Sequence, residues 1–389
     1  MKKALFISSR ELFPIIGGEK IRTAQQLELL SKLYIVDVIC ISENCKYNLG
    51  PLKKYINEYF HFYTPKWKNI INTLLFLFNK KPLQVNYYYS NKIQKFINKN
   101  INKYDLVFCN NLRTVDYILN KKIKPIKCID YVDAISMNYE RAKARSKGLK
   151  KLIYSIDYYR CNKYEQEILL DFDHHYIISD VDAQYILRNF PDKHITIINN
   201  AVEFIKESNL CNHNTQGVIT FVGKMSYDPN IIAVTNFAQN IMPRIWSTKP
   251  NTIFQIVGAN PTKAIKNLTT INPKIHVTGF VEDVNKYMCS STIIVAPMIT
   301  GAGVQNKILQ AMSLGCCVVT TSIGAEGLNC TNEEICIEDN NEKIANKIIA
   351  LLDNKEQRVE YGRKAYNYIK EHLTKDIIFE ILKEDLTKK

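Results

Sequence analysis

Two lysines in the second half of the chain stand where a phosphate could bind. Lys224 directly follows an apolar run that reads as a strand, and Lys307 lies one turn into a helix predicted over 305–314. Gly301 and Gly303 precede that helix and would let the backbone approach a ligand closely. The N–H groups and the dipole of a helix start favour an anion. Together these residues predict a diphosphate site, although Lys224 taken alone could be a solvated loop lysine.

Other motifs with known chemistry are weak or missing. The triplet DFD at 171–173, followed by His174 and His175, imitates a metal-binding DxD motif, but it precedes an apolar run and we expect no metal there. The eleven cysteines contain no CxxC pair and no cluster with zinc spacing. We therefore expect buried, small hydrophobic side chains in a reducing compartment. No GxGxxG loop, GxSxG elbow or Walker loop occurs.

The elements that must position these groups alternate between strands and helices. In the first half, a glycine-containing loop at 14–18 separates a strand from a helix whose apolar residues recur at helical spacing. The strands of this half are predicted at 3–9, 34–42, 105–110, 127–133 and 174–179. Strands that alternate with helices predict an α/β structure with a parallel sheet.

The same alternation restarts after a polar, aperiodic segment at 206–216, which reads as a linker. The strands of the second half are predicted at 218–223, 252–258, 276–279, 292–297 and 317–322, with one long helix near 230–246. We therefore predict two lobes with a cleft between them, where ligands usually bind. The predicted division is an N-terminal domain at 1–205, a linker at 206–216, a C-terminal domain at 217–370, and a last helix at 371–389 that packs back toward the N-terminal domain.

Three runs in the second half resemble the C-terminal domain of retaining GT-B glycosyltransferases of family four. They are FVGKMSYDPN at 221–230, HVTGFVEDV at 276–284 and APMITGAGVQNKILQAM at 296–312. The similarity is greater to bacterial sugar transferases associated with exopolysaccharide loci. The N-terminal half matches more loosely, in GGEKIR at 17–22 and DYVDAIS at 130–136. The resemblance implies two Rossmann-like domains whose parallel sheets face each other across a cleft.

The resemblance also implies roles for individual residues around a nucleotide-sugar donor. Lys224 and Lys307 would meet the diphosphate, and the turn at Phe280 and Val281 would hold the base. The remaining donor-binding residues by this resemblance are Gly17, Gly18, Lys20, Arg22, Gly223, Gly301, Ala302, Gly303, Val304, Gln305 and Gln310. For Lys20 and Arg22 the alternative is a solvated helix start.

The chain departs from the family pattern at three positions. The wider family has a Glu-x7-Glu signature where this chain has Ala302 and Gln310. Gln310 can still accept a hydrogen bond from a ribose hydroxyl through its carbonyl oxygen, but without charge assistance. Asp133 stands where a histidine is often found on the N-terminal lobe. It could orient an acceptor hydroxyl or accept its proton, and the alternative is a capping residue at a strand end.

We therefore expect a retaining hexosyltransferase that moves a sugar from a nucleoside diphosphate to a glycan or lipid-linked acceptor. In this family a diphosphate can be neutralised by lysines, backbone amides and a helix terminus, so no metal or other cofactor is expected. Two alternatives stay open. A non-catalytic GT-B subunit that partners an active transferase would explain Gln310, and a nucleotide-sugar epimerase shares the fold but would need more acid–base groups.

The charge of +14 is concentrated in one segment. Residues 51–150 hold 20 Lys and Arg against 6 Asp and Glu, whereas the rest of the chain is nearly neutral. Lysines at 66, 68, 80 and 81 flank an apolar stretch at 70–78, as in an interfacial membrane contact. The alternative is a core helix with a solvated basic rim. No run is long enough to span a bilayer, and Arg10 ends the first apolar stretch too early for a signal peptide. We expect a cytoplasmic protein at the inner face of the cell membrane that binds no nucleic acid.

Overall fold

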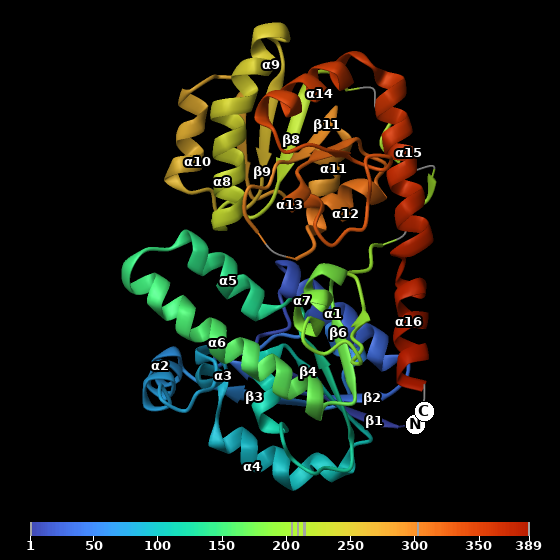
Figure 1. The fold of residues 1–389 in the computed structure, drawn as a ribbon. Helices are drawn as coiled ribbons and strands as arrows, with labels where there is room; N and C mark the ends of the chain where they lie inside the picture. The colour runs from blue at the N-terminus through green and yellow to red at the C-terminus, as the bar shows by residue number, and fades with distance from the viewer. Residues whose placement is uncertain (1, 204, 208–209, 213–214, 302, 388–389) are drawn as a thin grey trace. The chain divides into compact units, whose positions relative to one another are not determined.

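The computed structural model describes every residue except 1, 204, 208–209, 213–214, 302 and 388–389. The chain divides into two compact units. Unit 1 comprises Met1–Asn200 and Phe379–Lys389, and unit 2 comprises Ala201–Ile378. Each unit is an α/β structure around its own parallel sheet (Figure 1). The predicted pair of parallel α/β domains is confirmed.

Unit 1 is built on a seven-stranded sheet with the order β3-β2-β1-β4-β5-β6-β7. The central strands β1, β2, β4 and β5 are buried along almost their whole length, because helices cover both faces of the sheet. The strands are β1 (Lys3–Ser8), β2 (Ile35–Ser42), β3 (Tyr59–Tyr63), β4 (Leu106–Asn110), β5 (Ile126–Asp130), β6 (His174–Ile177) and β7 (Thr196–Ile197).

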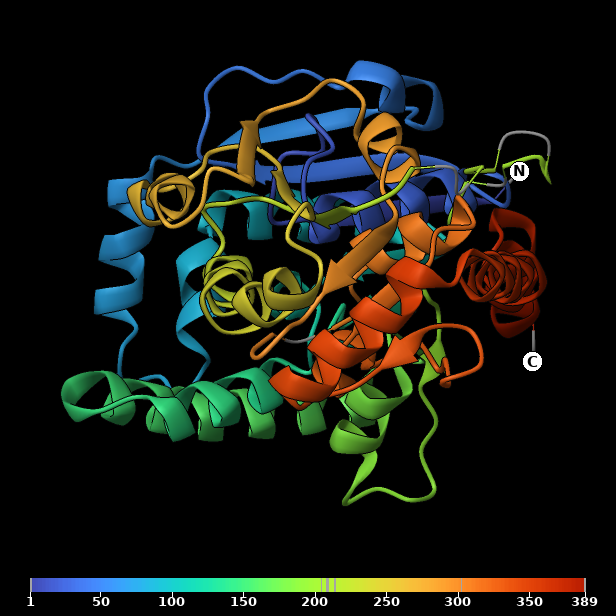
Figure 2. The ribbon, with the colours of Figure 1, turned by 90° about the horizontal axis from the view of Figure 1, so that it is seen from above.

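The helices of unit 1 include a long antiparallel pair, α5 (Ile135–Arg145) and α6 (Gly148–Asp171), which pack against each other (Figures 1 and 2). The other helices are α1 (Gly18–Ser31), α2 (Lys66–Leu75), α3 (Leu83–Tyr88), α4 (Asn91–Asn100) and α7 (Asp180–Leu187), with 3-10 turns η1 (Gly50–Tyr55), η2 (Ile101–Lys103) and η3 (Leu112–Tyr117).

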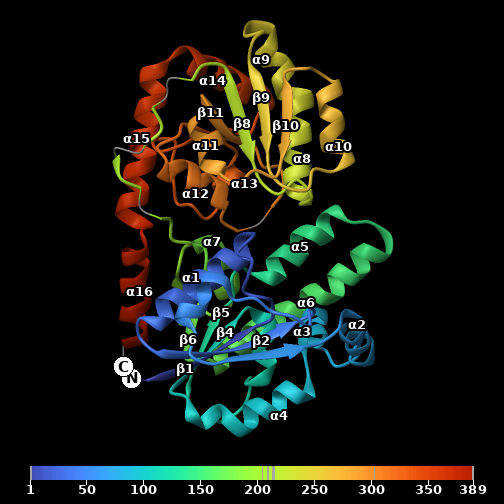
Figure 3. The same ribbon diagram turned by 180° about the vertical axis from the view of Figure 1, so that it is seen from behind.

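Unit 2 contains a six-stranded sheet with the order β10-β9-β8-β11-β12-β13, seen from behind in Figure 3. The strands are β8 (Val218–Val222), β9 (Ile253–Val257), β10 (Ile275–Gly279), β11 (Ile293–Ala296), β12 (Val318–Thr320) and β13 (Cys336–Ile337). The helices are α8 (Asp228–Asn236), α9 (Met242–Thr248), α10 (Lys263–Asn267), α11 (Val284–Cys289), α12 (Asn306–Ser313), α13 (Ser322–Ala325), α14 (Asn341–Asp353) and α15 (Lys355–His372), with the 3-10 turn η6 (Leu268–Thr270).

The helix predicted near 230–246 is interrupted in the structure. A π-helical turn, η5 (Phe237–Ile241), separates α8 from α9, and Pro243 follows it in the first turn of α9. Proline has no N–H and cannot continue the hydrogen-bond ladder, which accounts for the interruption.

The order of the strands reverses at one place in each sheet. In unit 1 the chain moves outward from β1 in one direction and from β4 in the other, and in unit 2 the same holds for β8 and β11. Ligands of open α/β sheets bind beyond the carboxyl ends of the strands at such a switch point. The loops that follow β8 and β11, which carry Lys224 and the glycines at 301 and 303, therefore lie at the binding edge of unit 2.

The segment predicted as a linker belongs to unit 2, and the boundary lies at Asn200 instead of residue 205. The Cys211 N–H donates to the Leu314 carbonyl over 3.0 Å, and Cys211 forms a disulfide with Cys289. The expectation that all the cysteines are free thiols is therefore wrong for this pair. Both contacts join residues far apart in the sequence, so the local polar composition gave no sign of them.

The last helix, α16 (Lys375–Thr387), starts in unit 2, and its residues from Phe379 onward belong to unit 1. Its Asp385 carboxylate lies 2.8 Å from His174 Nδ1 and accepts a hydrogen bond from the Thr196 hydroxyl over 2.8 Å. These contacts fix the C-terminal part of α16 against β6 and β7. Among the described residues, no helix is long and apolar enough to cross a membrane.

Candidate functional site

Two glycines allow close packing where strands β8 and β9 of unit 2 end. A Cβ atom on Gly258 would lie 1.8 Å from the Gly223 carbonyl oxygen, and one on Gly223 would lie 2.7 Å from the Asn230 amide nitrogen. Any side chain at either position would displace its neighbour. The glycines therefore let the end of β8, the end of β9 and the Asn230 side chain share one small volume.

Lys307 reaches into this region from the first turn of α12. Its Nζ donates to Asn230 Oδ1 over 2.6 Å and lies 4.5 Å from the centre of the Phe221 ring. The Met298 sulfur is 3.6 Å away. Within the part of the chain that the structure describes, no carboxylate lies at ion-pair distance, and burial lowers the pKa of Lys307 to about 7. The ammonium group is thus surrounded by neutral acceptors and lacks an anion.

Asn230 links two loops of this region, a contact that its sequence context did not predict. Its amide nitrogen donates to the Lys224 carbonyl over 3.0 Å while its oxygen accepts from Lys307. Asn230 is buried, so it ties the loop after β8 to the start of α12. Its membership of the 221–230 run was the available signal, but the run does not show that its partner lies 77 residues away.

The glycine loop before α12 has the backbone that the sequence suggested. Gly303 has a φ of 68° and Gly301 one of 146°, which favour glycine at both positions. Helix α12 begins at Asn306, two residues beyond Val304, and Gln305 at its N-cap makes no side-chain capping bond. Ala302, predicted to join the cradle, lies outside the described residues. The backbone at the start of α12 therefore keeps the character of an anion site.

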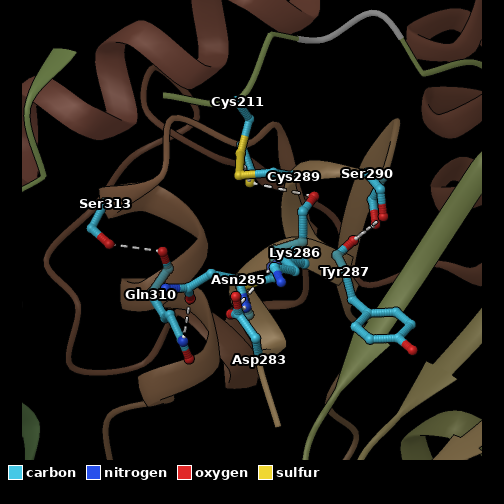
Figure 4. The surroundings of a disulfide bond; sticks show 12 residues. Cys211, Asp283, Asn285, Lys286, Tyr287, Cys289, Ser290, Gln310 and Ser313 are labelled. Atoms are coloured by element: carbon cyan, nitrogen blue, oxygen red, sulfur yellow. Dashed lines mark hydrogen bonds between the residues drawn. A yellow bond between two sulfur atoms is a disulfide. The ribbon is translucent and has the colours of Figure 1, made fainter. Parts of the chain in front are cut away.

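Gln310 is held by helix α11 (Figure 4). Its amide nitrogen donates to Asn285 Oδ1 over 2.7 Å, and Asp283 caps α11 by accepting from the Asn285 N–H over 3.0 Å. The other end of α11 is joined to Cys211 through the disulfide of Cys289. The bond to Asn285 fixes the orientation of the Gln310 amide, and its carbonyl oxygen is the group that can accept from a ligand hydroxyl.

The other residues predicted for unit 2 lie at the same carboxyl edge. Lys224 follows β8 and is exposed, and Phe280 follows β10 with 73% of its surface exposed, next to the half-buried Val281. The edge thus carries an exposed cation at one strand end and an exposed aromatic ring at another. Their roles toward a diphosphate and a base stay predictions.

In unit 1, Gly17 and Gly18 start α1 as expected, with Gly17 at the N-cap and a φ of 95°. Lys20 is half-buried in the first turn. Arg22 has neither the donor-binding position nor the solvated position that the sequence suggested. It is only 2% exposed, and its Nε and Nη2 donate to the two oxygens of Asp130 over 2.6 and 2.9 Å. Nη1 donates to the Ile198 carbonyl. Arg22 is neither solvated nor free to bind phosphate, because its donors hold the core of unit 1 together.

Asp133 lies just beyond the carboxyl end of β5, behind a strained residue. Val132 has a φ of 70°, which a β-branched residue rarely adopts, and its N–H donates to Asp130 Oδ1 over 2.9 Å. Asn138 donates to the Asp133 carboxylate over 2.7 Å. Burial, with a smaller contribution from the charge of Asp182, raises the pKa of Asp133 to about 7. A carboxylate with this pKa can accept or give a proton near neutral pH.

The DFD triplet has structural partners in unit 1. Asp171 accepts from Lys127 Nζ over 2.8 Å, and Asp173 accepts from the Lys127 N–H over 2.8 Å, so both carboxylates fix the start of β5. Across the described ranges, no group of three His, Cys, Asp or Glu side chains is arranged to hold a metal ion.

The comparison with known families concerns unit 2. Residues 216–354 match the family described as glycosyl transferases group 1, and this range contains all the unit 2 site residues above. A Klebsiella pneumoniae protein described as an uncharacterized 44.6 kDa protein in cps region is 24% identical over 404 residues, which cover 99% of this chain and 100% of that protein.

Solved structures resemble the whole chain. S. aureus TarM gives a TM-score of 0.72 with 13% identity, over 100% of this chain and 99% of TarM. Anabaena HepE, crystallised with UDP and glucose, gives a TM-score of 0.68 with 12% identity over 100% of both chains. The chain therefore has the GT-B fold, and its residues 216–354 match the glycosyl transferases group 1 family.

Proposed function

We propose that the protein is a glycosyltransferase that takes its sugar from a nucleoside diphosphate donor bound by unit 2. One observation carries the proposal: the ammonium group of the half-buried Lys307 has no carboxylate partner among the described residues and stands at the switch point of the sheet, in the first turn after a glycine loop. The family match over 216–354 and the likeness to HepE, which was crystallised with UDP and glucose, support it.

The leaving diphosphate would be neutralised by fixed groups of the chain. Lys307, Lys224 and the start of α12 supply positive charge before the reaction begins, so they need little reorganisation as charge develops. We propose that this charge makes a metal ion unnecessary. A bound diphosphate would also favour the protonated form of Lys307, because an anion nearby raises the pKa of an ammonium group.

We further propose a retaining reaction in which the acceptor attacks on the face that the diphosphate leaves. This route needs no nucleophilic side chain. Asp133 would orient the acceptor hydroxyl or take its proton, in keeping with a pKa near 7 and with the strained backbone at Val132.

For the acceptor we propose a glycan or lipid-linked sugar of surface polysaccharide synthesis, used at an anionic membrane surface. The K. pneumoniae relative is described by its place in a cps region. The lysine-flanked stretch at 66–81 carries exposed apolar side chains, among them Trp67, Leu74 and Phe78. Apolar side chains beside lysines suit the interface of an anionic membrane.

A non-catalytic GT-B subunit is the second candidate function. Gln310 favours it, because an amide replaces the charged acceptor that the wider family has at this position.

A thermal-shift screen with UDP-, GDP-, ADP- and dTDP-sugars in the presence of EDTA distinguishes the enzyme from the non-catalytic subunit. An enzyme should show a raised melting temperature with one of these donors, since a ligand that binds only the native state stabilises it, and should then hydrolyse or transfer that sugar. Absence of nucleotide binding by calorimetry would favour the subunit.

Lys307→Met should lower turnover by about 10²-fold, the scale for losing one preorganised charge-stabilising group. Methionine keeps most of the apolar stem, so the fold should persist. The measurement is donor hydrolysis or transfer at saturating donor, and Lys266→Met on the exposed face of α10 is the matched control. Near-normal turnover of a folded Lys307→Met protein would remove Lys307 from the diphosphate site.

Gln310→Glu should tighten donor binding or leave it unchanged, because an ionised acceptor forms a stronger bond to a hydroxyl. Asn285 can then turn its amide so that its nitrogen donates to the new carboxylate. The double variant Asn285→Asp with Gln310→Glu places two carboxylates together and should weaken donor binding, measured by calorimetry. If Gln310→Glu alone abolishes binding in a folded protein, the ribose role of this residue is wrong.

The pH profile of kcat/KM should be bell-shaped with both limbs near pH 7. Asp133 has a raised pKa, so its base form is lost as the pH falls below about 7, and Lys307 has a lowered pKa, so its charge is lost as the pH rises above about 7. Asp133→Asn should remove the acid limb and cost about 10²-fold or more in rate.

Two further variants check the assignment of these limbs. Lys307→Arg stays protonated and should move the alkaline limb upward. Asp180→Asn, in the first turn of α7, is the control for the carboxylate and should leave the profile unchanged. A flat profile between pH 5 and 9 would contradict both assignments, where these limits are about two units on either side of the two pKa values.

A further inference from the structure

Unit 1 contains a pocket of about 520 Å³ that none of the site residues above lines. It lies between α6, η3, the start of α4 and the loop that joins α2 to α3. Basic side chains dominate its lining, namely Lys80, Lys81, Lys121, Arg160 and Lys163, against the two carboxylates of Asp116 and Glu167. The lining therefore carries three more positive than negative charges.

Both carboxylates already have partners. Lys81 Nζ lies 2.6 Å from Asp116 Oδ1, which also accepts from the Tyr164 hydroxyl over 3.1 Å. Lys163 and Glu167 form a more exposed pair one turn apart on α6, with 3.9 Å between Nζ and Oε1. In the described part of the chain, the other three cations of the pocket have no carboxylate at ion-pair distance.

The donors of two of these cations meet only neutral oxygens. Lys121 Nζ donates to the Tyr117 carbonyl over 2.8 Å and to Asn98 over 3.4 Å. Arg160 Nη2 donates to the Leu77 carbonyl, and its Nη1 is buried with no hydrogen-bond partner among the described residues. A buried guanidinium donor without an acceptor is costly, and an anion in the pocket would satisfy it.

The loop that carries Lys80 is fixed in place. The Asn79 side chain accepts from the Lys81 N–H over 3.0 Å and exchanges hydrogen bonds with the buried Asn86 of α3. Lys80 itself is held at a φ of 63°, in the left-handed region. The backbone that carries Lys80 and Lys81 is thus positioned before any ligand arrives, which lowers the entropy cost of binding.

Exposed apolar side chains stand next in the sequence to residues that line the pocket: Phe78 precedes Asn79, and Tyr159 precedes Arg160. Arg160 of α6 donates to the Leu77 carbonyl just beyond α2, and Asp157 of α6 accepts from the N–H of Leu83, the first residue of α3, over 2.9 Å. Helix α6 is therefore bonded to both ends of the loop that joins α2 to α3. The exposed apolar side chains on this part of the chain are Trp67, Leu74, Leu75 and Phe78 from the α2 stretch, and Leu149, Leu152, Ile153, Ile156 and Tyr159 from α6. Apolar clusters of this kind on a soluble surface mark contact sites.

We propose that this pocket binds the phosphate group of a membrane lipid, while the apolar side chains of α2 and α6 contact the lipid's hydrocarbon region. A phosphate matches three cations that have no carboxylate partner among the described residues, one of which is the half-buried Arg160 with its buried, unsatisfied Nη1. The exposed apolar side chains next to the pocket residues favour a lipid over a soluble phosphate, which would gain nothing from them. The inference rests on the proposed use of an anionic membrane surface and names the site that would recognise it.

The test compares vesicles of phosphatidylcholine that contain either phosphatidic acid or oleate at the same surface potential. Wild-type protein should sediment with phosphatidic acid vesicles about tenfold more tightly than with oleate vesicles, a difference of the size expected for charge-assisted bonds to phosphate. The variant Lys121→Gln with Arg160→Gln should lose this preference and bind about thirtyfold more weakly, since each lysine or arginine near an anionic surface contributes about 1 kcal/mol.

The matched control is Lys95→Gln with Lys99→Gln, which removes two exposed charges from α4 outside the pocket. It should keep the preference for phosphatidic acid. Equal losses in both double variants would mean that charge acts diffusely and would overturn the pocket. Tight binding of inorganic pyrophosphate with no preference for phosphatidic acid would overturn the lipid and point to a soluble phosphate.

Two measurements keep the result interpretable. Lys121→Gln alone, which leaves the Arg160 contact with Leu77 intact, tests the pocket if the double variant unfolds. Donor hydrolysis should stay normal in all of these variants, because none of the residues belongs to the donor site. Normal hydrolysis without phosphate selectivity would refute the pocket and leave the proposed transferase activity standing. Selective vesicle binding without any use of a donor would refute the transferase activity and leave the phosphate pocket standing.

Discussion

The proposed donor site of unit 2 depends on one half-buried lysine, Lys307, which has no carboxylate at ion-pair distance among the described residues. Taking the charge of Lys307 out of water is costly, and the surroundings offset this only with an amide oxygen, an aromatic face and a sulfur atom. The cost appears as a lowered pKa, so the group is close to balance between its charged and neutral forms at neutral pH. An anion that binds beside Lys307 would shift this equilibrium toward the charged form.

The packing around Lys307 brings neutral groups close to its ammonium. Asn230 must come close enough to offer its oxygen, and it can do so only because Gly223 has no side chain. Gly258 must in turn approach the Gly223 carbonyl. On the other side of α12, Gln310 is oriented by Asn285, and helix α11 is fixed by an aspartate cap at one end and a disulfide at the other. The site is therefore built from neutral contacts that leave its charge available.

Unit 1 contains the opposite arrangement. The guanidinium of Arg22 is fully buried, and both oxygens of Asp130 and a backbone carbonyl accept from it. Such a pair is costly to break and offers nothing to a ligand. The Arg22–Asp130 pair also helps to position Asp133. Asp130 accepts from the N–H of Val132, and the left-handed backbone of Val132 leads directly to Asp133. The buried Arg22 is thus paired and structural, whereas the half-buried Lys307 has no carboxylate partner among the described residues and could meet an anion in the proposed donor site.

The sequence alone determined the local features of this protein. The alternation of strands and helices predicted the parallel α/β units. Gly301, Gly303 and Lys307 could be placed around a helix start after a strand, because strands, turns and helix termini depend on neighbouring residues. Only the tertiary structure decided which distant residues meet. Asp130 lies 108 residues from Arg22, Asn230 lies 77 from Lys307, and Cys211 lies 78 from Cys289. Such pairings depend on the order of strands in the sheet and on how helices pack across it, and periodicity reports which face of an element is buried but not what covers it.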